Sequence, residues 1–393
     1  MTDPMPQNLL SARIEKIAVS ATMAMTQAAR DLKAQGRDVI SLSAGEPDFD
    51  TPAHICEAAN AAIAAGHTRY TAVDGIMPLK EAICEKFKRD NDLSYTPSQI
   101  HVAPGGKPVL FNALAVTVNE GDEVIIPAPC WVSYPDMVRL CGGVPIVVPC
   151  SANTQYKITQ PILKASISAR TKWVILNSPS NPTGAAYSAQ ELEALAEILR
   201  DHPHVMVLSD DIYEHLVYDD FTFATLAQVA PDLKDRVLTM NGVSKAYAMT
   251  GWRIGYGAGP DGLIGAMRKY AGQTTSNPSS ISQHAALAAL NGPHDFLRDW
   301  KAAYKRRRDM MAARINAIDG LSCQIPEGAF YLFVDCRKRS DDDQALAMSL
   351  LNDQAVATVP GTAFHAPGHL RLSYAASDHE LETACTRLEA YFS

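Results

Sequence analysis

Short apolar runs alternate with amphipathic stretches over most of the chain. Segment 189–200 places Leu192, Leu195 and Leu199 on one helical face, as expected of a helix that packs on a core. The apolar runs are rich in β-branched residues and end at turn residues, which is typical of buried strands. They lie at 122–127 (DEVIIP), 172–177 (KWVILN), 205–210 (VMVLSD) and 236–241 (RVLTMN). This alternation predicts an α/β fold with a mostly parallel sheet covered by helices.

The C-terminal part of the chain follows a different order. Segment 295–319 predicts a long basic helix, and a further helix is predicted at the end of the chain. Between them, 328–336 (GAFYLFVDC) and 369–377 (HLRLSYAAS) predict half-buried strands. We expect this part to form a second, smaller domain. The four cations at 305–308 have acids nearby, so they predict a solvated helix face rather than a nucleic-acid contact.

Length and composition narrow the class of protein. At 393 residues the chain exceeds one ordinary core, and we expect two domains. The formal net charge of -8 has both signs interspersed, which argues against nucleic acid as a partner. We expect neither a signal peptide nor a membrane span, because no apolar run reaches roughly 18 residues. The eight cysteines include no C-x-x-C pair, which predicts core thiols, no metal site and a cytoplasmic setting.

One glycine motif points to a nicotinamide cofactor. Gly257, Gly259 and Gly262 follow a predicted strand and precede a predicted helix, as in a dinucleotide-binding loop. Segment 277–282 lacks the acid that would bind a ribose, and Pro260 removes a backbone donor from the turn. We therefore do not expect a nicotinamide site.

Polar residues stand at the C-terminal ends of three predicted strands. Asn181 follows the strand at 172–177, and Lys245 follows the strand at 236–241. Asp210 ends the strand between them, with Tyr213 just beyond it. Taken singly, these residues are typical of a turn, a helix cap and a surface amine. Because open α/β sheets bind ligands where such strand ends meet, the four together form a candidate site.

This set of groups suits pyridoxal phosphate. That cofactor needs an amine for a Schiff base, an acid against its pyridine nitrogen and donors on its ring oxygen. Its phosphate needs backbone and cationic donors. The turn formed by Gly105, Gly106 and Lys107 precedes a helix that we expect to open at Pro108, and free N–H groups at a helix start favour an anion. Arg253 can add a charged fork to the same phosphate.

Nearly the whole chain resembles the fold-type-I, class I aminotransferases, especially the branch of bacterial aspartate aminotransferases. The segments that carry the resemblance occur in order, and together they are very specific. They are SAGEPDFDTP (43–52), TRYTAVDGIMPLKEAI (68–83), GGK (105–107), PCWVSYP (129–135), NSPSNPTG (177–184), SDDIYEHLVY (209–218), SKAYAMTGWRIGYGAGP (244–260) and VPGTAF with RLSYA (359–375).

The resemblance implies an architecture. It implies a large domain at 46–290 that binds pyridoxal phosphate on a seven-stranded, mostly parallel sheet. A small α+β domain at 291–393 is completed by the N-terminal segment 1–45, which also joins the subunit interface. The assembly is implied to be a homodimer whose sites are completed across that interface.

The resemblance also implies roles for the residues around the cofactor ring. Lys245 binds the cofactor and moves the proton, and Asp210 pairs with the pyridine nitrogen. Asn181 and Tyr213 donate to the ring oxygen. Trp131 stacks on the ring.

Further residues are implied to hold the phosphate and the substrate. For the phosphate these are the backbone after Gly105, the side chains of Ser244 and Arg253, and Tyr70 of the partner subunit. For the substrate, Arg371 clamps the α-carboxylate with help from the backbone of Gly45, beside Trp131 and Asn181; a planar guanidinium suits this task.

The third position of the glycine turn bears on the substrate. A lysine there resembles the aspartate-using branch, in which it faces the distal carboxylate of the substrate, and Ser20 can add a hydroxyl. The alternative is that Lys107 extends to solvent from a helix start.

Two positions depart from the family pattern. Gly242 replaces a frequent hydroxyl residue and leaves that contact to Ser244, and Pro108 leaves Gly106 and Lys107 as the amide donors.

The implied activity is transfer of an amino group between an L-amino acid, with aspartate or glutamate favoured, and a 2-oxo acid in ping-pong fashion. A carbon–sulfur β-lyase on the same fold is the nearest alternative, because both reactions begin with removal of the Cα proton. The effector domain of a transcription regulator is a third, but about 40 residues before SAGEPDF leave no room for a DNA-binding domain.

Overall fold

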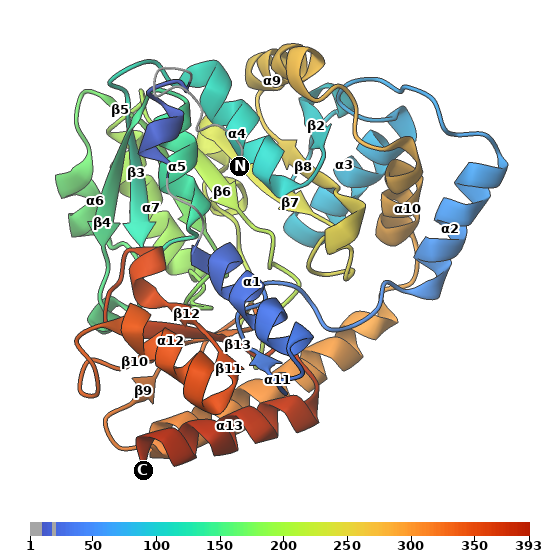
Figure 1. Cartoon of the computed structure of the whole chain (residues 1–393). Coiled ribbons are helices and arrows are strands. Elements are labelled where there is room, and N and C mark those ends of the chain that lie inside the picture. Colours follow the sequence, from blue (N-terminus) through green and yellow to red (C-terminus); the bar gives the residue numbers. More distant parts are fainter. Residues whose placement is uncertain (1–9, 18–20) are drawn as a thin grey trace.

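The computed structural model describes residues 10–17 and 21–393, and its largest element is a seven-stranded sheet (Figure 1). The strand order is β2-β8-β7-β6-β5-β3-β4, and β8 runs antiparallel to both of its neighbours. The strands are β2 (Ile100–Ala103), β3 (Glu123–Ala128), β4 (Val144–Pro149), β5 (Thr171–Asn177), β6 (Met206–Asp210), β7 (Val237–Gly242) and β8 (Gly255–Ala258). The predicted α/β class is confirmed, and the four apolar runs form β3, β5, β6 and β7.

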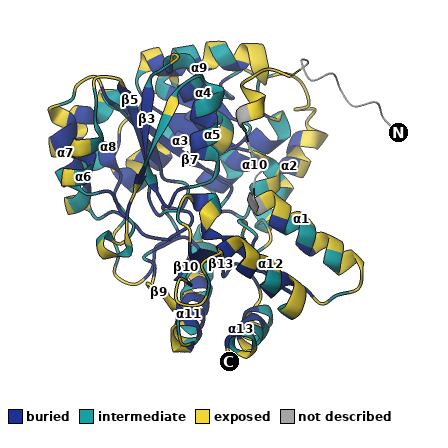
Figure 2. Cartoon of the chain, turned by 60° about the vertical axis from the view of Figure 1, so that its left-hand side comes forward, coloured by how far each residue is buried: buried dark blue, intermediate teal, exposed yellow. Residues whose placement is uncertain are grey.

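Helices cover both faces of this sheet because its strands are apolar on both sides. Along β5, Val174 and Leu176 pack against one layer of helices, and Trp173 and Ile175 pack against the other. In Figure 2 the central strands are mostly buried and the helices are exposed on their outer sides. The first layer is α2 (Ala53–Ala64), α3 (Met77–Asn91), α6 (Gln160–Ser166), α7 (Ala189–Arg200), α8 (Leu226–Val229) and α10 (Ser280–Asn291), and the second is α4 (Gly106–Thr117), α5 (Ser133–Leu140) and α9 (Asp261–Thr274).

Both ends of the described chain contribute to a second hydrophobic cluster below the large sheet in Figure 1. A four-stranded sheet has the order β12-β13-β10-β9, and β1 pairs in parallel with β11. The elements are α1 (Ala21–Ala34), β1 (Ile40–Ser41), α11 (Asp295–Ala317), β9 (Ser322–Cys323), β10 (Tyr331–Asp335), α12 (Asp343–Gln354), β11 (Val356–Ala357), β12 (Val359–Pro360), β13 (His369–Ser373) and α13 (Asp378–Phe392). The domain boundaries at 45/46 and 290/291 stay a prediction.

The strands β10 and β13 are buried on both sides, so the prediction of half-buried strands is wrong. Leu370 and Leu372 face the cluster of apolar residues around α11, α12 and α13. Arg371, between them, faces the other way and donates to Asn181 beside the large sheet. The alternating pattern is real, but its polar face is covered by another part of the same chain.

The cations at 305–308 also differ from the prediction of a solvated face. Arg307 is buried and binds Asp48 at 3.0 Å and Asp378 at 2.9 Å. Arg308 is buried and donates to Asp219 at 2.7 Å. Two of the four cations therefore connect α11 to other segments, and a guanidinium suits this because it can be buried when several acceptors surround it.

Two smaller predictions have mixed outcomes. Cys130, Cys150, Cys336 and Cys385 are buried and the other four cysteines are half-buried, so the core position holds for half of them. The glycine motif at 257–262 does join a strand to a helix, β8 to α9. Because β8 is antiparallel, its C-terminal end lies at the edge opposite the carboxyl ends of the parallel strands.

Among residues 10–17 and 21–393, no helix is both long and apolar enough to cross a membrane.

Candidate active site

The carboxyl ends of β5, β6 and β7 border a cavity of about 420 Å³. Side chains from the large sheet, from the segment after β1 and from β13 line this cavity. The predicted site residues in its wall are Gly45, Gly106, Lys107, Trp131, Asn181, Asp210, Tyr213, Ser244, Lys245, Arg253 and Arg371. The structure therefore brings these residues together, although they are spread over most of the sequence.

Lys245 presents its amine to the cavity. Its Nζ donates to the carbonyl oxygen of Gly45, and it lies 5.8 Å from the centre of the Tyr213 ring. Burial lowers the pKa of Lys245 to about 8; Glu46 opposes this shift, and Arg371 and Arg253 add to it. A larger share of this amine is thus neutral near pH 8 than for an ordinary lysine, as a nucleophile or base requires.

Asp210 ends β6 and is buried. Its Oδ2 accepts a hydrogen bond from the Tyr134 hydroxyl at 2.6 Å, and its Oδ1 accepts one from the Ile212 backbone at 3.3 Å. Burial raises the pKa of Asp210 to about 6, and these two hydrogen bonds oppose the increase. Tyr134 was not among the predicted site residues, and only its place in the PCWVSYP segment pointed to it.

Arg371 is buried and held from two sides. Its Nη1 donates to Asn181 Oδ1 at 3.0 Å, and its Nη2 donates to the Ser43 carbonyl at 2.7 Å. Its Nε has no hydrogen-bond partner among the described residues. Tyr213 and Tyr331, whose hydroxyl oxygens are 2.8 Å apart, lie beside this guanidinium. Tyr331 was also missed by the sequence reasoning, because a tyrosine in a buried strand is usually part of the core.

The glycine turn lies against Arg253. The helix α4 begins at Gly106, two residues before the predicted start at Pro108, so the amides of Gly106 and Lys107 belong to its open first turn. Gly105 has a φ of +107°, and a Cβ on it would lie 2.3 Å from Arg253 Nη2. Gly255 was not predicted, yet a Cβ there would lie 2.4 Å from the backbone of Gly105 and Gly106. Close approach of two backbones leaves no sequence signal except glycine itself.

The packing around Gly242, one of the two positions that depart from the family pattern, is tight. A Cβ on Gly242 would lie 3.1 Å from the Cα of Gly255, the carbonyl oxygen of Ile254 and the Cδ1 of Ile212. Two of these atoms are backbone and cannot rotate away. A hydroxyl residue is therefore disfavoured at 242, while Ser244 lines the cavity.

The structure does not bring every predicted residue into the cavity. Tyr70 is 92% exposed and borders a separate surface hollow with Thr275 and Ser276. Ser20 lies outside the described residues. Lys107 is in the cavity wall, with its Nζ 5.0 Å from the centre of the Trp131 ring. Burial, with a smaller effect of Arg253, lowers the pKa of Lys107. By accessible surface the residue as a whole is exposed, so extension toward solvent stays an alternative to a contact with the substrate.

Comparison with known proteins identifies the family of this chain. Residues 37–388 match the family described as Aminotransferase class I and II. The chain belongs to this family. The predicted resemblance is thus confirmed, and so is the expectation that the protein is an aminotransferase.

Other proteins, some of them with solved structures, are similar to this aminotransferase over nearly its whole length. It is 55% identical to the aspartate/prephenate aminotransferase of Cereibacter sphaeroides, covering 97% of this chain and 98% of that one. An aspartate aminotransferase structure from Rhizobium meliloti is 51% identical with a TM-score of 0.94, covering 97% and 98%. One from Thermus thermophilus with maleate is 43% identical with a TM-score of 0.93, covering 97% and 99%. These names support amino-group transfer rather than the β-lyase alternative.

Proposed function

We propose that this aminotransferase uses pyridoxal phosphate to move an amino group between aspartate or glutamate and a 2-oxo acid, with 2-oxoglutarate or oxaloacetate as acceptor. The observation that carries the proposal is the convergence of Lys245, Asp210 and Arg371 on one cavity. An amine, a carboxylate and a guanidinium are the groups needed for the cofactor aldehyde, the pyridine nitrogen and the substrate α-carboxylate.

The residues present fit that cofactor. The open first turn of α4 and the adjacent Arg253 guanidinium would hold its phosphate. Asp210 would face its ring nitrogen, Asn181 and Tyr213 would face its ring oxygen, and Trp131 would cover the ring. When bound, the cofactor supplies an aldehyde that condenses with amines and a ring that takes up the electrons of the broken Cα–H bond.

The protein's own residues would then handle the proton and the carboxylates. As a free amine, Lys245 would take the Cα proton of the substrate on its Nζ, which its lowered pKa favours. Arg371 pairs with the α-carboxylate, and its buried Nε fits a further acceptor. The second 2-oxo acid follows the same path in reverse, as in a ping-pong mechanism.

An acidic substrate is supported by Lys107 and by the relatives. Lys107 lines both this cavity and a second hollow of about 670 Å³, so its cation would be available to a second carboxylate of the substrate. The Thermus relative was solved with maleate, a dicarboxylate, and several relatives are named for aspartate. We further propose that the protein acts as a homodimer in which Tyr70 of the partner subunit reaches the phosphate, in keeping with its exposure here.

A half-reaction assay tests the proposal. The protein is loaded with pyridoxal phosphate and mixed with single amino acids, and the absorbance of the cofactor joined to Lys245 is followed. We expect aspartate and glutamate to remove this absorbance faster than alanine, with release of the matching 2-oxo acid. Lys245→Ala should lack both the absorbance and turnover. A protein that binds no pyridoxal phosphate, or releases pyruvate and ammonia from cystathionine instead, would overturn it.

A further inference from the structure

A buried tyrosine hydroxyl lies against the Asp210 carboxylate, and the proposed function does not use this contact. The Tyr134 hydroxyl donates to Asp210 Oδ2 at 2.6 Å, whereas the Ile212 backbone donates to Oδ1 at the longer distance of 3.3 Å. Tyr134 is 2% exposed and Asp210 is 3% exposed, so water does not compete for this hydrogen bond. A hydrogen bond to an ionised acceptor in such surroundings is about twice as strong as one between neutral groups.

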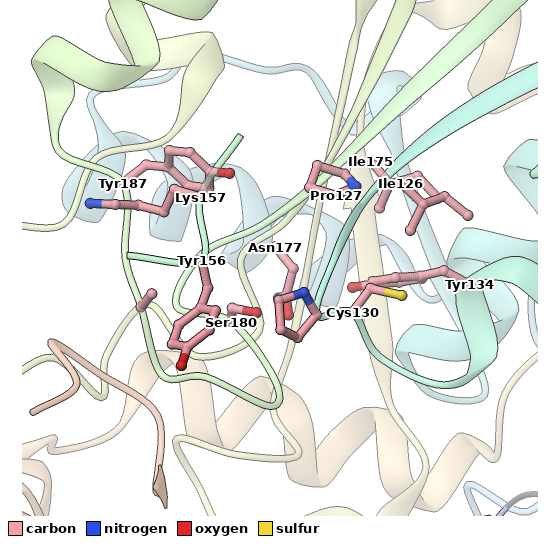
Figure 3. A pocket seen from close by; sticks show the side chains of 12 residues that line it. Ile126, Pro127, Cys130, Tyr134, Tyr156, Lys157, Ile175, Asn177, Ser180 and Tyr187 are labelled. Atoms are coloured by element: carbon pink, nitrogen blue, oxygen red, sulfur yellow. The ribbon is translucent and has the colours of Figure 1, made fainter. Parts of the chain in front are cut away.

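The surroundings of Tyr134 make Asp210 its hydrogen-bond acceptor. The residue stands in the first turn of α5, and its ring meets the edge of Trp131 with the centroids 5.3 Å apart. Its other side borders a small enclosed cavity of about 20 Å³, shared with Cys130 and Asn177 (Figure 3). Burial, and then Asp210, raise the pKa of the Tyr134 hydroxyl well above its ordinary value. The hydroxyl therefore keeps its proton and donates a hydrogen bond to the carboxylate.

We propose that Tyr134 is a positioning residue that keeps Asp210 ionised and aimed at the ring nitrogen of the cofactor. Burial alone favours the neutral acid, and the Tyr134 hydrogen bond acts in the opposite direction. An ionised Asp210 stabilises the protonated ring nitrogen, which is the form that withdraws electrons from Cα. This inference rests on the proposed function, because it presupposes that pyridoxal phosphate binds beside Asp210.

Loss of the hydroxyl has a defined effect. In Tyr134→Phe the ring and its contact with Trp131 remain, while the carboxylate loses one charged hydrogen bond. The pKa of Asp210 then rises, its pairing with the ring nitrogen weakens, and the pKa of that nitrogen falls by about one unit. We expect kcat to fall about 10-fold and KM for the donor to change little, because substrate contacts are intact.

The chain offers a matched control in Tyr187. This residue lines the same small cavity, is buried, and its hydroxyl accepts a hydrogen bond from the Ile158 backbone at 2.9 Å rather than touching Asp210 (Figure 3). Tyr187→Phe therefore removes a buried hydroxyl without changing the site. It should follow the wild type in the pKa of the ring nitrogen and in kcat.

The test uses holoenzyme carrying cofactor labelled with ¹⁵N in the ring, whose nitrogen resonance reports protonation as pH is varied. Wild type, Tyr134→Phe, Tyr187→Phe, Asp210→Asn and the double variant of Tyr134 and Asp210 are compared. We expect a lower nitrogen pKa in Tyr134→Phe, and no further change when Tyr134→Phe is added to Asp210→Asn.

Each other outcome has a definite meaning. Equal nitrogen pKa values in wild type and Tyr134→Phe, or additive losses in the double variant, would overturn the role of Tyr134. So would a Tyr134→Phe protein that fails to fold when Tyr187→Phe folds, because Tyr134 would then serve the fold. Failure of the wild type to bind pyridoxal phosphate would instead overturn the proposed function itself.

Discussion

At the scale of single residues, we expect Lys107 to set the proposed preference for acidic substrates. Its amine lies over Trp131 at the edge of the cavity, and a flexible lysine can move aside for an uncharged substrate. Lys107→Ser should reduce kcat/KM for aspartate and glutamate by about 1.5–3 kcal/mol of transition-state binding, the range for a hydrogen bond to a charged group. Values for alanine and aromatic donors should change little. Equal losses for acidic and neutral donors would assign Lys107 to the cofactor or the fold.

Two adjacent aspartates allow a paired test of the acid that faces the ring. Asp210→Asn removes the charge that stabilises a protonated ring nitrogen, so kcat should fall about 100-fold or more with the cofactor still bound. Asp211 accepts a hydrogen bond from Ser209 at 2.7 Å, and its burial raises its pKa to about 7. Because an amide resembles the neutral acid, Asp211→Asn should retain most of the activity. Steady-state kinetics on both variants tests this difference. Near-normal turnover in Asp210→Asn would show that Asp210 does not stabilise the protonated ring nitrogen.

At the scale of elements, a buried ion pair connects α3 to the loop that carries Tyr213. Lys86 pairs with Glu214 and also donates to Asn91 at 2.8 Å. Asn91 donates in turn to Glu214 at 3.0 Å. Burial favours the neutral acid, yet Lys86 and His215 lower the pKa of Glu214 below its ordinary value. The network therefore holds an ionised carboxylate next to a residue of the candidate site.

Removing the cation from this network should destabilise the protein. Lys86→Met leaves Glu214 charged and buried without its main partner, so we expect the free energy of unfolding to fall by about 3–5 kcal/mol in urea titrations. Lys88→Met is the control on the same helix, because its pair with Asp92 is exposed and should contribute little. A Lys86→Met protein as stable as Lys88→Met would show that water or another group compensates Glu214.

Most elements followed from the pattern of apolar positions, but the start of α4 did not. Proline fits the first helical position, which led to the prediction that the helix opens at Pro108. The first four N–H groups of any helix lack an internal partner, so a proline also fits the third position that it occupies here. The sequence alone does not distinguish these positions. In the structure the helix starts at Gly106, where the backbone of the turn packs closely against Gly255.

At the scale of the whole molecule, the exposure of Tyr70 predicts complementation between subunits. Tyr70→Ala and Lys245→Ala proteins should each be inactive. A hybrid dimer restores one complete site, so equal mixing should recover about one quarter of wild-type activity after subunit exchange. Exchange is verified by mass spectrometry of the mixed dimers. Absence of recovery in verified hybrids would mean that Tyr70 acts within its own chain or has no role.

The sequence by itself determined the α/β class, the strands that carry Asn181, Asp210 and Lys245, and the family. The class and the strands follow because apolar periodicity is local and because polar residues at parallel strand ends must share an edge. The family follows from the ordered segments that resemble it. Tertiary structure alone decided the rest. It buried Arg307 among distant acids, left no room for a side chain at Gly255, and set Tyr134 against Asp210. These contacts join residues far apart in the chain, and their formation depends on how the layers pack rather than on any local pattern.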